Sequence, residues 1–185
     1  MKLDLKEIAS IICRAEGRTD LAQVHNQLRS LGAKRLVTAP GAEEVYGPRG
    51  ALLYGIDSIF RARLLLVLVD LGFEGEALQQ VYTSACANRT VTTEAGRFDL
   101  NLQEVIRQYA EASQNAFTLE ITASRAEGLG YHAQWVMNGE RFGRADPLAS
   151  NSVVPGRRIE AVIHIPVHSI FAQLAAGLDA MGQPE

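Results

Sequence analysis

Cysteine is scarce in this sequence of 185 residues, which contains only Cys13 and Cys86. The two lie far apart, with no C-x-x-C pair and no neighbouring histidine, so neither a disulfide framework nor a metal site is indicated. Two isolated thiols are typical of a protein in the reducing cytoplasm. We therefore predict a cytoplasmic protein that binds no metal and no cofactor.

Long apolar runs are also lacking. The longest run of large apolar side chains, residues 64–69, is far shorter than the ~20 residues that a transmembrane helix needs. The first ten residues alternate charged with apolar side chains, which is not the pattern of a signal peptide. The sequence therefore predicts no association with a membrane.

An excess of positive charge is missing from the chain as a whole, since 18 Lys and Arg stand against 21 Asp and Glu. The net charge of -3 argues against coating of nucleic acid through bulk charge. The distribution is uneven, because residues 1–64 hold ten basic and seven acidic side chains and the remainder holds eight and fourteen. Any surface that faces a polyanion is expected in the first third.

Catalytic motifs are absent as well. The sequence shows no Ser/His/Asp order, no Gly-Lys phosphate-binding loop and no paired-carboxylate motif above chance. With 47% apolar residues the chain can nevertheless bury a core, which excludes disorder as its main state. The sequence therefore favours a folded protein that is not an enzyme.

Helical spacing dominates the first 88 residues. Asp4 with Glu7 predicts a capped helix over residues 4–16 that Gly17 ends. Asp20 can cap a second helix over about residues 20–31, with Gly32 as its stop and with this apolar stripe: Leu21, Val24, Leu28 and Leu31.

Extended segments at 34–39 and 51–54 around a turn-rich stretch predict a β-hairpin, which we call the wing (residues 34–54). Asp57 can cap a third helix that runs to Gly72, and residues 76–86 predict a fourth. These elements form an expected first domain, residues 1–88.

A polar stretch, residues 88–97, predicts a linker to a second domain, residues 98–185. That domain is expected to begin with a helix at residues 99–113 and a hairpin of two strands at 117–124 and 130–137. A long loop at 138–158, a strand at 159–167 and a last helix at 168–178 are expected to follow. The fold class is therefore α+β: a winged helix-turn-helix, helical with a small β-wing, followed by a small α/β unit with an antiparallel sheet.

A helix pair followed by a hairpin in the basic third of the chain is typical of a winged helix-turn-helix. The second helix would read the major groove, where Asn and Gln pair with adenine and Arg with guanine, and the wing would contact phosphates. The alternative is an ordinary solvated helix and scattered basic residues, with Glu43 and Glu44 repelling phosphate. The expected DNA-binding residues are Gln23, Asn26, Gln27, Arg29, Ser30, Lys34, Arg35, Tyr46, Arg49, Arg61 and Arg63.

Residues 5–81 resemble the N-terminal domain of the MerR family of transcription regulators. In that family the wing returns through an aromatic residue, an acid opens the next helix, and an L-G-F corner precedes the fourth helix. The matching residues here are Tyr54, Asp57, Leu71, Gly72, Phe73 and Leu78. The resemblance implies a DNA-binding domain.

The sequence departs from the family in two places. The recognition helix of the family usually carries an arginine followed by two aromatic residues and an acid. Residues 26–29 stand in their place here, so the family's base contacts cannot be transferred to this sequence. The long coiled-coil helix that usually joins family dimers is also missing, and an α/β unit follows instead.

Polar and aromatic residues in the second unit can line a pocket or pack in a sheet. Tyr131, Trp135 and Phe142 are weak candidates for ligand binding, although Tyr131 and Trp135 share one strand face and core packing suits Trp135 better. His164 and His168 have a helical ligand spacing, but Pro166 between them favours a strand end at which they diverge.

The sequence thus predicts a transcription regulator that binds double-stranded DNA as a homodimer and is controlled through its C-terminal unit by a small molecule or protein. Two alternatives remain open: a phage-type architectural or recombination-directing DNA-binding protein, and a protein-interaction adaptor. A fragment of residues 90–185 is expected to fold alone and to self-associate. The candidate dimer surfaces are Leu102, Val105, Ile106, Tyr109, Ile170, Leu174 and Leu178.

Overall fold

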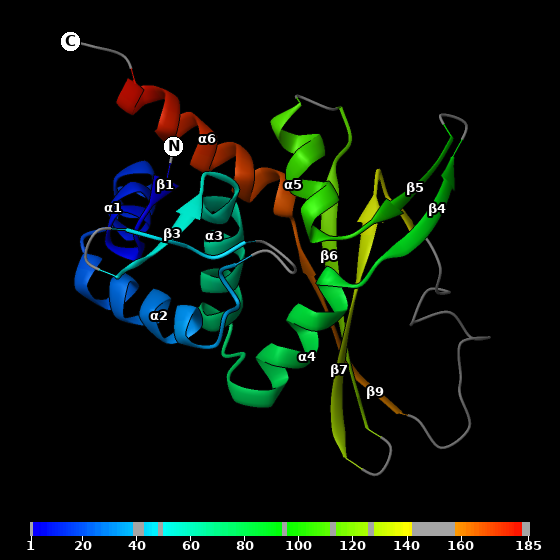
Figure 1. Cartoon of the computed structure of the whole chain (residues 1–185). Helices are drawn as coiled ribbons and strands as arrows, with labels where there is room; N and C mark the ends of the chain where they lie inside the picture. Colours follow the sequence, from blue (N-terminus) through cyan, green and yellow to red (C-terminus); the bar gives the residue numbers. More distant parts are fainter. Residues whose placement is uncertain are drawn as a thin grey trace. The chain divides into compact units, whose positions relative to one another are not determined.

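A computed structural model gives the fold of the chain, a mixed α+β architecture (Figure 1). It describes residues 2–38, 43–47, 50–93, 96–111, 114–125, 128–141 and 158–182. The chain divides into two compact units, which we call the first unit (residues 1–72 and 169–185) and the second unit (residues 73–168). The first unit is therefore built from two separate segments of the chain.

Helix α1, Leu5–Glu16, begins and ends as the sequence predicts. The Asp4 carboxylate accepts from the Glu7 N–H at 2.8 Å, and the Glu7 carboxylate accepts from the Asp4 N–H at the same distance. This reciprocal capping box satisfies N–H groups that the first turn leaves without helical partners. Gly17 ends the helix with φ +64°, a left-handed conformation that glycine adopts without strain.

Helix α2, Leu21–Ala33, buries three of the four residues in the predicted apolar stripe: Val24, Leu28 and Leu31. Leu21, at the first position of the helix, is 38% exposed and does not belong to the buried stripe. Gly32 does not end the helix. A Cβ atom there would come within 2.8 Å of Leu5 and 3.1 Å of the Tyr54 hydroxyl, so the glycine allows close packing.

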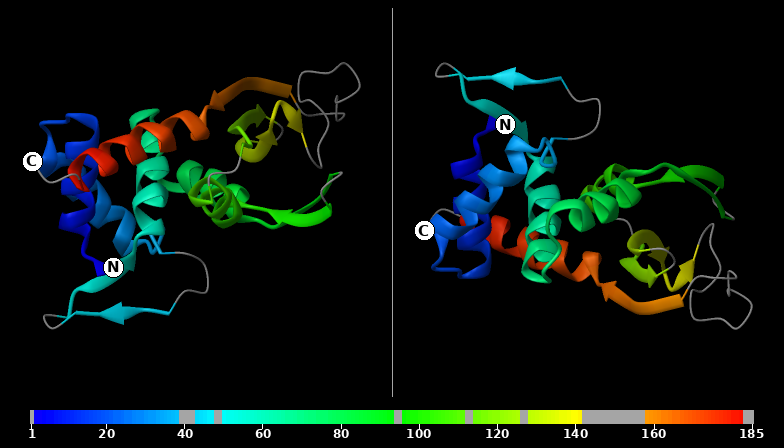
Figure 2. Two further views of the ribbon diagram at one scale, coloured as in Figure 1. Left: turned by 90° about the horizontal axis from the view of Figure 1, so that it is seen from above. Right: turned by 90° about the horizontal axis from the view of Figure 1, so that it is seen from below.

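A small antiparallel sheet with the strand order β1-β3-β2 completes this part of the first unit. Its strands are β1 (Lys2–Leu3), β3 (Leu52–Gly55) and β2 (Val45–Tyr46). The expected strand over 34–39 is wrong for residues 34–38, which are not in a strand. Both views of Figure 2 show the β2–β3 hairpin (cyan) projecting from the helices.

Helix α3, Asp57–Asp70, forms the centre of the first unit. Asp57 is its first residue rather than its N-cap, which is Ile56, and residues 64–66 and 68 are buried. Helix α6, Val167–Gly182, returns from the far end of the chain to this unit (Figure 2). There the rings of Phe171 and Phe60 meet edge to face, 5.1 Å between centroids.

Gly177 lets α6 approach α1, because a Cβ atom at this position would overlap Ala15. Alanine normally favours a helix over glycine by about 1 kcal/mol. We expect Gly177→Ala instead to lower the free energy of unfolding by about 1–3 kcal/mol through overpacking. Thermal denaturation by circular dichroism measures this, with Ala176→Ser on the exposed side of α6 as control. A higher melting temperature for Gly177→Ala would contradict the close packing.

The second unit begins with α4, Gly75–Cys86, and continues into a hairpin of β4 (Arg89–Thr93) and β5 (Gly96–Leu100). The prediction of a linker at residues 88–97 is therefore wrong, because residues 89–93 form β4 and pair with β5. Asn101 caps α5, Leu102–Ala110, by accepting from the Glu104 N–H at 2.9 Å. The helix is shorter than the expected 99–113 at its start, because residues 96–100 belong to the hairpin.

A four-stranded antiparallel sheet with the order β8-β7-β6-β9 is the main feature of the second unit (Figure 1). The two predicted strands are confirmed as β6 (Phe117–Arg125) and β7 (Leu129–Met137), and the third as β9 (Arg158–Ile165). The sheet's remaining strand is β8 (Glu140–Arg141). A register shift opposite residues 123 and 124 of β6 bends β9.

Trp135 of β7 anchors the core of the second unit at 1% exposure. Its indole N–H donates to the carbonyl of Ala85 in α4 at 2.9 Å. The N–H of Tyr131 donates to the side chain of Gln80, also in α4, at 2.9 Å, and the Tyr131 ring contacts Phe73 edge-on. Helix α4 is thus part of the second unit, so the units divide at Gly72 and Phe73 and not near residue 88.

None of the helices that the structure describes combines the length and apolar character that crossing a bilayer requires.

Candidate nucleic-acid interface

Helix α2 exposes a continuous polar face. Gln23, Asn26, Arg29 and Ser30 are exposed, on the side opposite the buried Val24, Leu28 and Leu31. Gln27 lies at the border of this face, half-buried, and its Oε1 has no hydrogen-bond partner. Four of the five side chains expected to read bases are therefore accessible on one helix surface, with the donors and acceptors that base edges require.

The corner between α1 and α2 is held by an ionic network. Arg18 donates to Asp20 through Nε at 3.0 Å and Nη2 at 2.7 Å, and its Nη1 lies 3.6 Å from Asp70 at the end of α3. The hydrogen bonds from Arg18 lower the pKa of Asp20. Asp20 therefore does not cap α2 with its side chain as expected, but joins the corner to α3 through Arg18.

The end of α2 explains why residues 34–38 are not a strand. The N–H of Leu36 donates to the carbonyl of Leu31 at 3.0 Å, and that of Arg35 to Gly32 at 2.9 Å. This is a Schellman motif, accompanied by burial of both Leu31 and Leu36. It places Arg35 in the left-handed position where glycine is usual, with φ +57°.

Arg35 therefore stabilises the fold less than glycine would, because a left-handed residue with a Cβ costs roughly 1 kcal/mol. We expect Arg35→Gly to raise the free energy of unfolding by about 0.5–1 kcal/mol. Lys34→Gly is the matched control, since Lys34 has φ -85° and gains nothing from glycine. Urea denaturation compares the two, and equal effects of both variants would refute the strain at Arg35.

Glu44 contacts two of the wing side chains that are expected to contact phosphate, Arg35 and Tyr46. Its Oε1 lies 3.2 Å from Nη1 of Arg35, and its Oε2 accepts from the hydroxyl of Tyr46 at 2.6 Å. The hydrogen bond to Glu44 raises the pKa of Tyr46. Arg35 and Tyr46 are both largely exposed, at 77% of the side chain and 58% of the residue. Lys34 is exposed beside them, and Arg49 lies outside the described residues.

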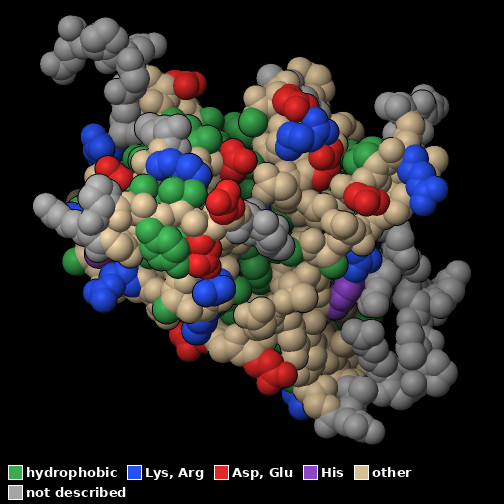
Figure 3. Space-filling model, in the orientation of Figure 1, with side chains coloured by type: hydrophobic (Ala, Val, Ile, Leu, Met, Phe, Trp, Pro, Cys, Tyr) green, Lys and Arg blue, Asp and Glu red, His purple; other side chains and the backbone are tan. Residues whose placement is uncertain are grey.

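Two of the expected DNA-binding residues belong to the interior instead. Arg61 is only 1% exposed within α3, and Arg63 pairs with Glu16 of α1 with 15% of its side chain exposed. Neither can reach a nucleic acid, because α3 is enclosed on most sides. On the face that Figure 3 shows, Lys and Arg alternate with Asp and Glu over the first unit, without a field of one sign.

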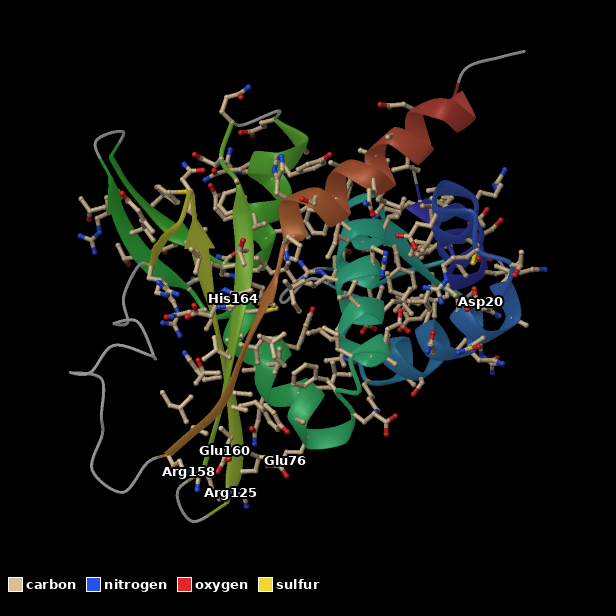
Figure 4. The ribbon with its side chains drawn as sticks, turned by 180° about the vertical axis from the view of Figure 1, so that it is seen from behind. Asp20, Glu76, Arg125, Arg158, Glu160 and His164 are labelled. Carbon is tan, nitrogen blue, oxygen red and sulfur yellow. The ribbon has the colours of Figure 1, made fainter. Side chains whose placement is uncertain are left out.

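The second unit contains a buried polar cluster that the sequence does not reveal. Glu120 of β6 is fully buried; its Oε1 accepts from Gln134 at 2.5 Å and its Oε2 from Arg141 at 2.7 and 2.9 Å. His164 of β9, opposite Glu120 in the register, approaches to 3.8 Å (Figure 4). Because the carboxylate fixes the Gln134 amide as donor, the Oε1 of that amide is left buried without a partner.

A second polar group lies near the start of β4, where the ring of His132 contacts Arg89 at 2.7 Å through Nε2 and Ser84 at 3.4 Å through Nδ1. Arginine is always a donor, so Nε2 must be the acceptor and Nδ1 carries the proton of the neutral ring. That proton points at Ser84. In this tautomer His132 cannot take a proton from the serine, so the pair does not form an activated nucleophile.

The weak ligand-binding candidates are not brought together as a site. Trp135 is core, as its burial shows, Tyr131 packs against Phe73, and Phe142 lies outside the described residues. The expected dimer surfaces are corrected too, because their central residues are at most 1% exposed within the chain: Leu102, Val105, Ile106 and Leu174. The apolar stripes cover the units' own cores.

His164 and His168 lie in different elements, β9 and α6, on either side of Pro166. His168 contacts the ring of Tyr109. Burial raises the pKa of the Cys13 thiol, and no disulfide links it to Cys86. Within the described ranges, no three His, Cys, Asp or Glu side chains gather as a metal site.

Comparison of the sequence with protein-family models and with curated proteins finds no match. The resemblance to the MerR family therefore rests on the residues quoted above.

Proposed function

We propose that this protein is a cytoplasmic, DNA-binding transcription regulator with a MerR-like winged helix-turn-helix in its first unit. One observation carries the proposal: α2 buries one face and exposes Gln23, Asn26, Arg29 and Ser30 on the other, next to an ion-paired corner. Side chains of these types recognise base edges in the major groove. The helix would enter that groove with its apolar face held by the unit's core.

The β2–β3 hairpin would act as the wing. It projects from the helices of the first unit (Figure 2), and Lys34 and Arg35 stand at the end of α2, ahead of it in the sequence. Contacts from such residues to phosphates position a protein on the duplex without reading its sequence. With Arg61 buried and Arg63 paired with Glu16, these two cations and Arg29 carry the described positive charge of the interface.

The second unit would control the first, and the excess of fourteen acidic over eight basic side chains in residues 65–185 disfavours a further DNA surface there. We also propose a homodimer, because one recognition helix reads only a few base pairs. The dimer surface would have to differ from the apolar stripes of α5 and α6, which the fold buries.

Selection of bound sequences from a random DNA pool tests the proposal directly. Recovery of a defined motif, followed by a fluorescence-anisotropy titration that separates motif from random duplex, is the expected result. Equal affinity of the protein for both, or no binding to either at low salt, would overturn it. Binding without discrimination would favour the architectural alternative, and no binding at all would favour the protein-interaction adaptor.

A further inference from the structure

Glu44 is an acid at the centre of a segment where a DNA-binding wing would carry positive charge. It contacts both Arg35, at 3.2 Å, and the hydroxyl of Tyr46, at 2.6 Å. A carboxylate that pairs with a guanidinium and accepts from a phenol presents two anionic oxygens to them, as a backbone phosphate would. The adjacent Glu43 is exposed and contacts neither side chain in the described structure.

Arg35 is held in place at a cost in local conformation. Its φ of +57° is the position where glycine would relieve strain, and the Schellman hydrogen bonds fix the backbone on both sides. Strain of this kind persists where a particular side chain is needed at that position. The side chain present is an exposed cation whose charge is directed to Glu44.

From these contacts we infer that Glu44 is an internal mimic of a DNA phosphate, which occupies Arg35 and Tyr46 until a backbone phosphate displaces it. The inference rests on the proposed function and deepens it by assigning Glu44 a role in specificity. On random DNA the ion pair competes with phosphate, so the wing adds little affinity. At a specific site, base contacts from α2 hold the duplex in place and the phosphate replaces Glu44.

The experiment compares Glu44→Gln with Glu43→Gln in the full-length protein. Both variants remove one negative charge from adjacent residues, but only the first releases Arg35 and Tyr46. We expect Glu44→Gln to bind a random-sequence duplex about threefold more tightly than the wild type, the scale of one exposed ion pair. Glu43→Gln should stay close to the wild type. Discrimination between selected and random duplex should fall for Glu44→Gln only.

Two further measurements separate contact from bulk charge. In a double-mutant cycle, Arg35→Ala should abolish most of the gain from Glu44→Gln, because the two residues then no longer interact. Ultraviolet titration without DNA should show a lower pKa for Tyr46 in Glu44→Gln than in the wild type, since the acceptor that raises it is gone.

Equal gains from Glu43→Gln and Glu44→Gln, or a gain that survives Arg35→Ala, would overturn the inference and leave DNA binding intact. If the wild type fails to bind either duplex at low salt, the proposed function itself fails, and the Tyr46 titration still reports whether Glu44 holds the wing. The two failures are thus distinguishable.

Discussion

Alanine at Asn26 or at Arg29 is expected to weaken binding to a selected DNA site by roughly 5- to 150-fold, the range of a single base-edge contact worth about 1–3 kcal/mol. Both side chains stand on the exposed face of α2, with no hydrogen bond or ion pair to the rest of the described chain. Their removal should leave the fold intact, because neither covers the core.

Random-sequence duplex provides the internal comparison. Asn26→Ala should bind it as the wild type does, and Arg29→Ala should lose only the small share that one positive charge contributes. Arg97→Ala, which removes an exposed charge from β5 in the second unit, is the matched control for Arg29. Losses of the same size on selected and random DNA would show that α2 contacts the backbone and does not read bases.

Methionine at Arg141 is expected to lower the free energy of unfolding by about 3 kcal/mol, because it leaves a fully buried carboxylate without its cationic partner. Among the described residues, Glu120 would keep the hydrogen bond from Gln134 and the approach of His164 to 3.8 Å. Adding Glu120→Gln to this variant removes the unpaired charge and keeps the shape, so it should recover much of the loss.

The measurement is urea denaturation followed by tryptophan fluorescence. Trp135 is the only tryptophan and is buried in the second unit, so the signal reports on that unit. Arg107→Met is the control: Arg107 pairs with Glu104 on the surface with half of its side chain exposed, and its loss should cost less than about 1 kcal/mol. A similar cost for the two arginines, or no recovery with Glu120→Gln, would contradict the buried pair.

Elements whose ends are determined by interactions between residues close in sequence could be predicted from the sequence. The capping box of Asp4 and Glu7 and the left-handed Gly17 set the bounds of α1. Strands β6 and β7 followed from two β-rich runs around a glycine turn. In each case the deciding interactions are formed between residues close in sequence.

Elements decided by long-range contacts could not be predicted. Arg61 looks like a surface cation in the sequence, but α3 is enclosed by other elements and buries it. Residues 34–38 contain apolar and β-branched side chains, which favour a strand. The N–H groups of residues 34–36 instead donate to carbonyl groups of α2. The 88–97 segment did carry a usable signal, alternating Thr90, Val91 and Thr92 ahead of Gly96, which favours a hairpin over a linker.

The candidate site also contains features that could be predicted from the sequence and features that could not. The exposed face of α2 follows from helical periodicity, so four of its five polar residues were correctly placed on the surface. From the sequence, Glu44 could be interpreted only as a charge that repels phosphate, because its contacts with Arg35 and Tyr46 form only in the folded chain. Glu120 lies between Leu119 and Ile121 in β6, but the sequence does not identify Arg141 as its partner.

The division of the first unit into residues 1–72 and 169–185 makes the second unit an insertion within it. A ribosome that synthesises the chain releases the complete second unit before α6 emerges, so the inserted unit can finish folding earlier although it begins later. Until then Phe60 and Ala15 lack their contacts with α6. A nascent chain would therefore complete the α1–α3 core, and the proposed DNA-binding surface on α2, only after the second unit already exists.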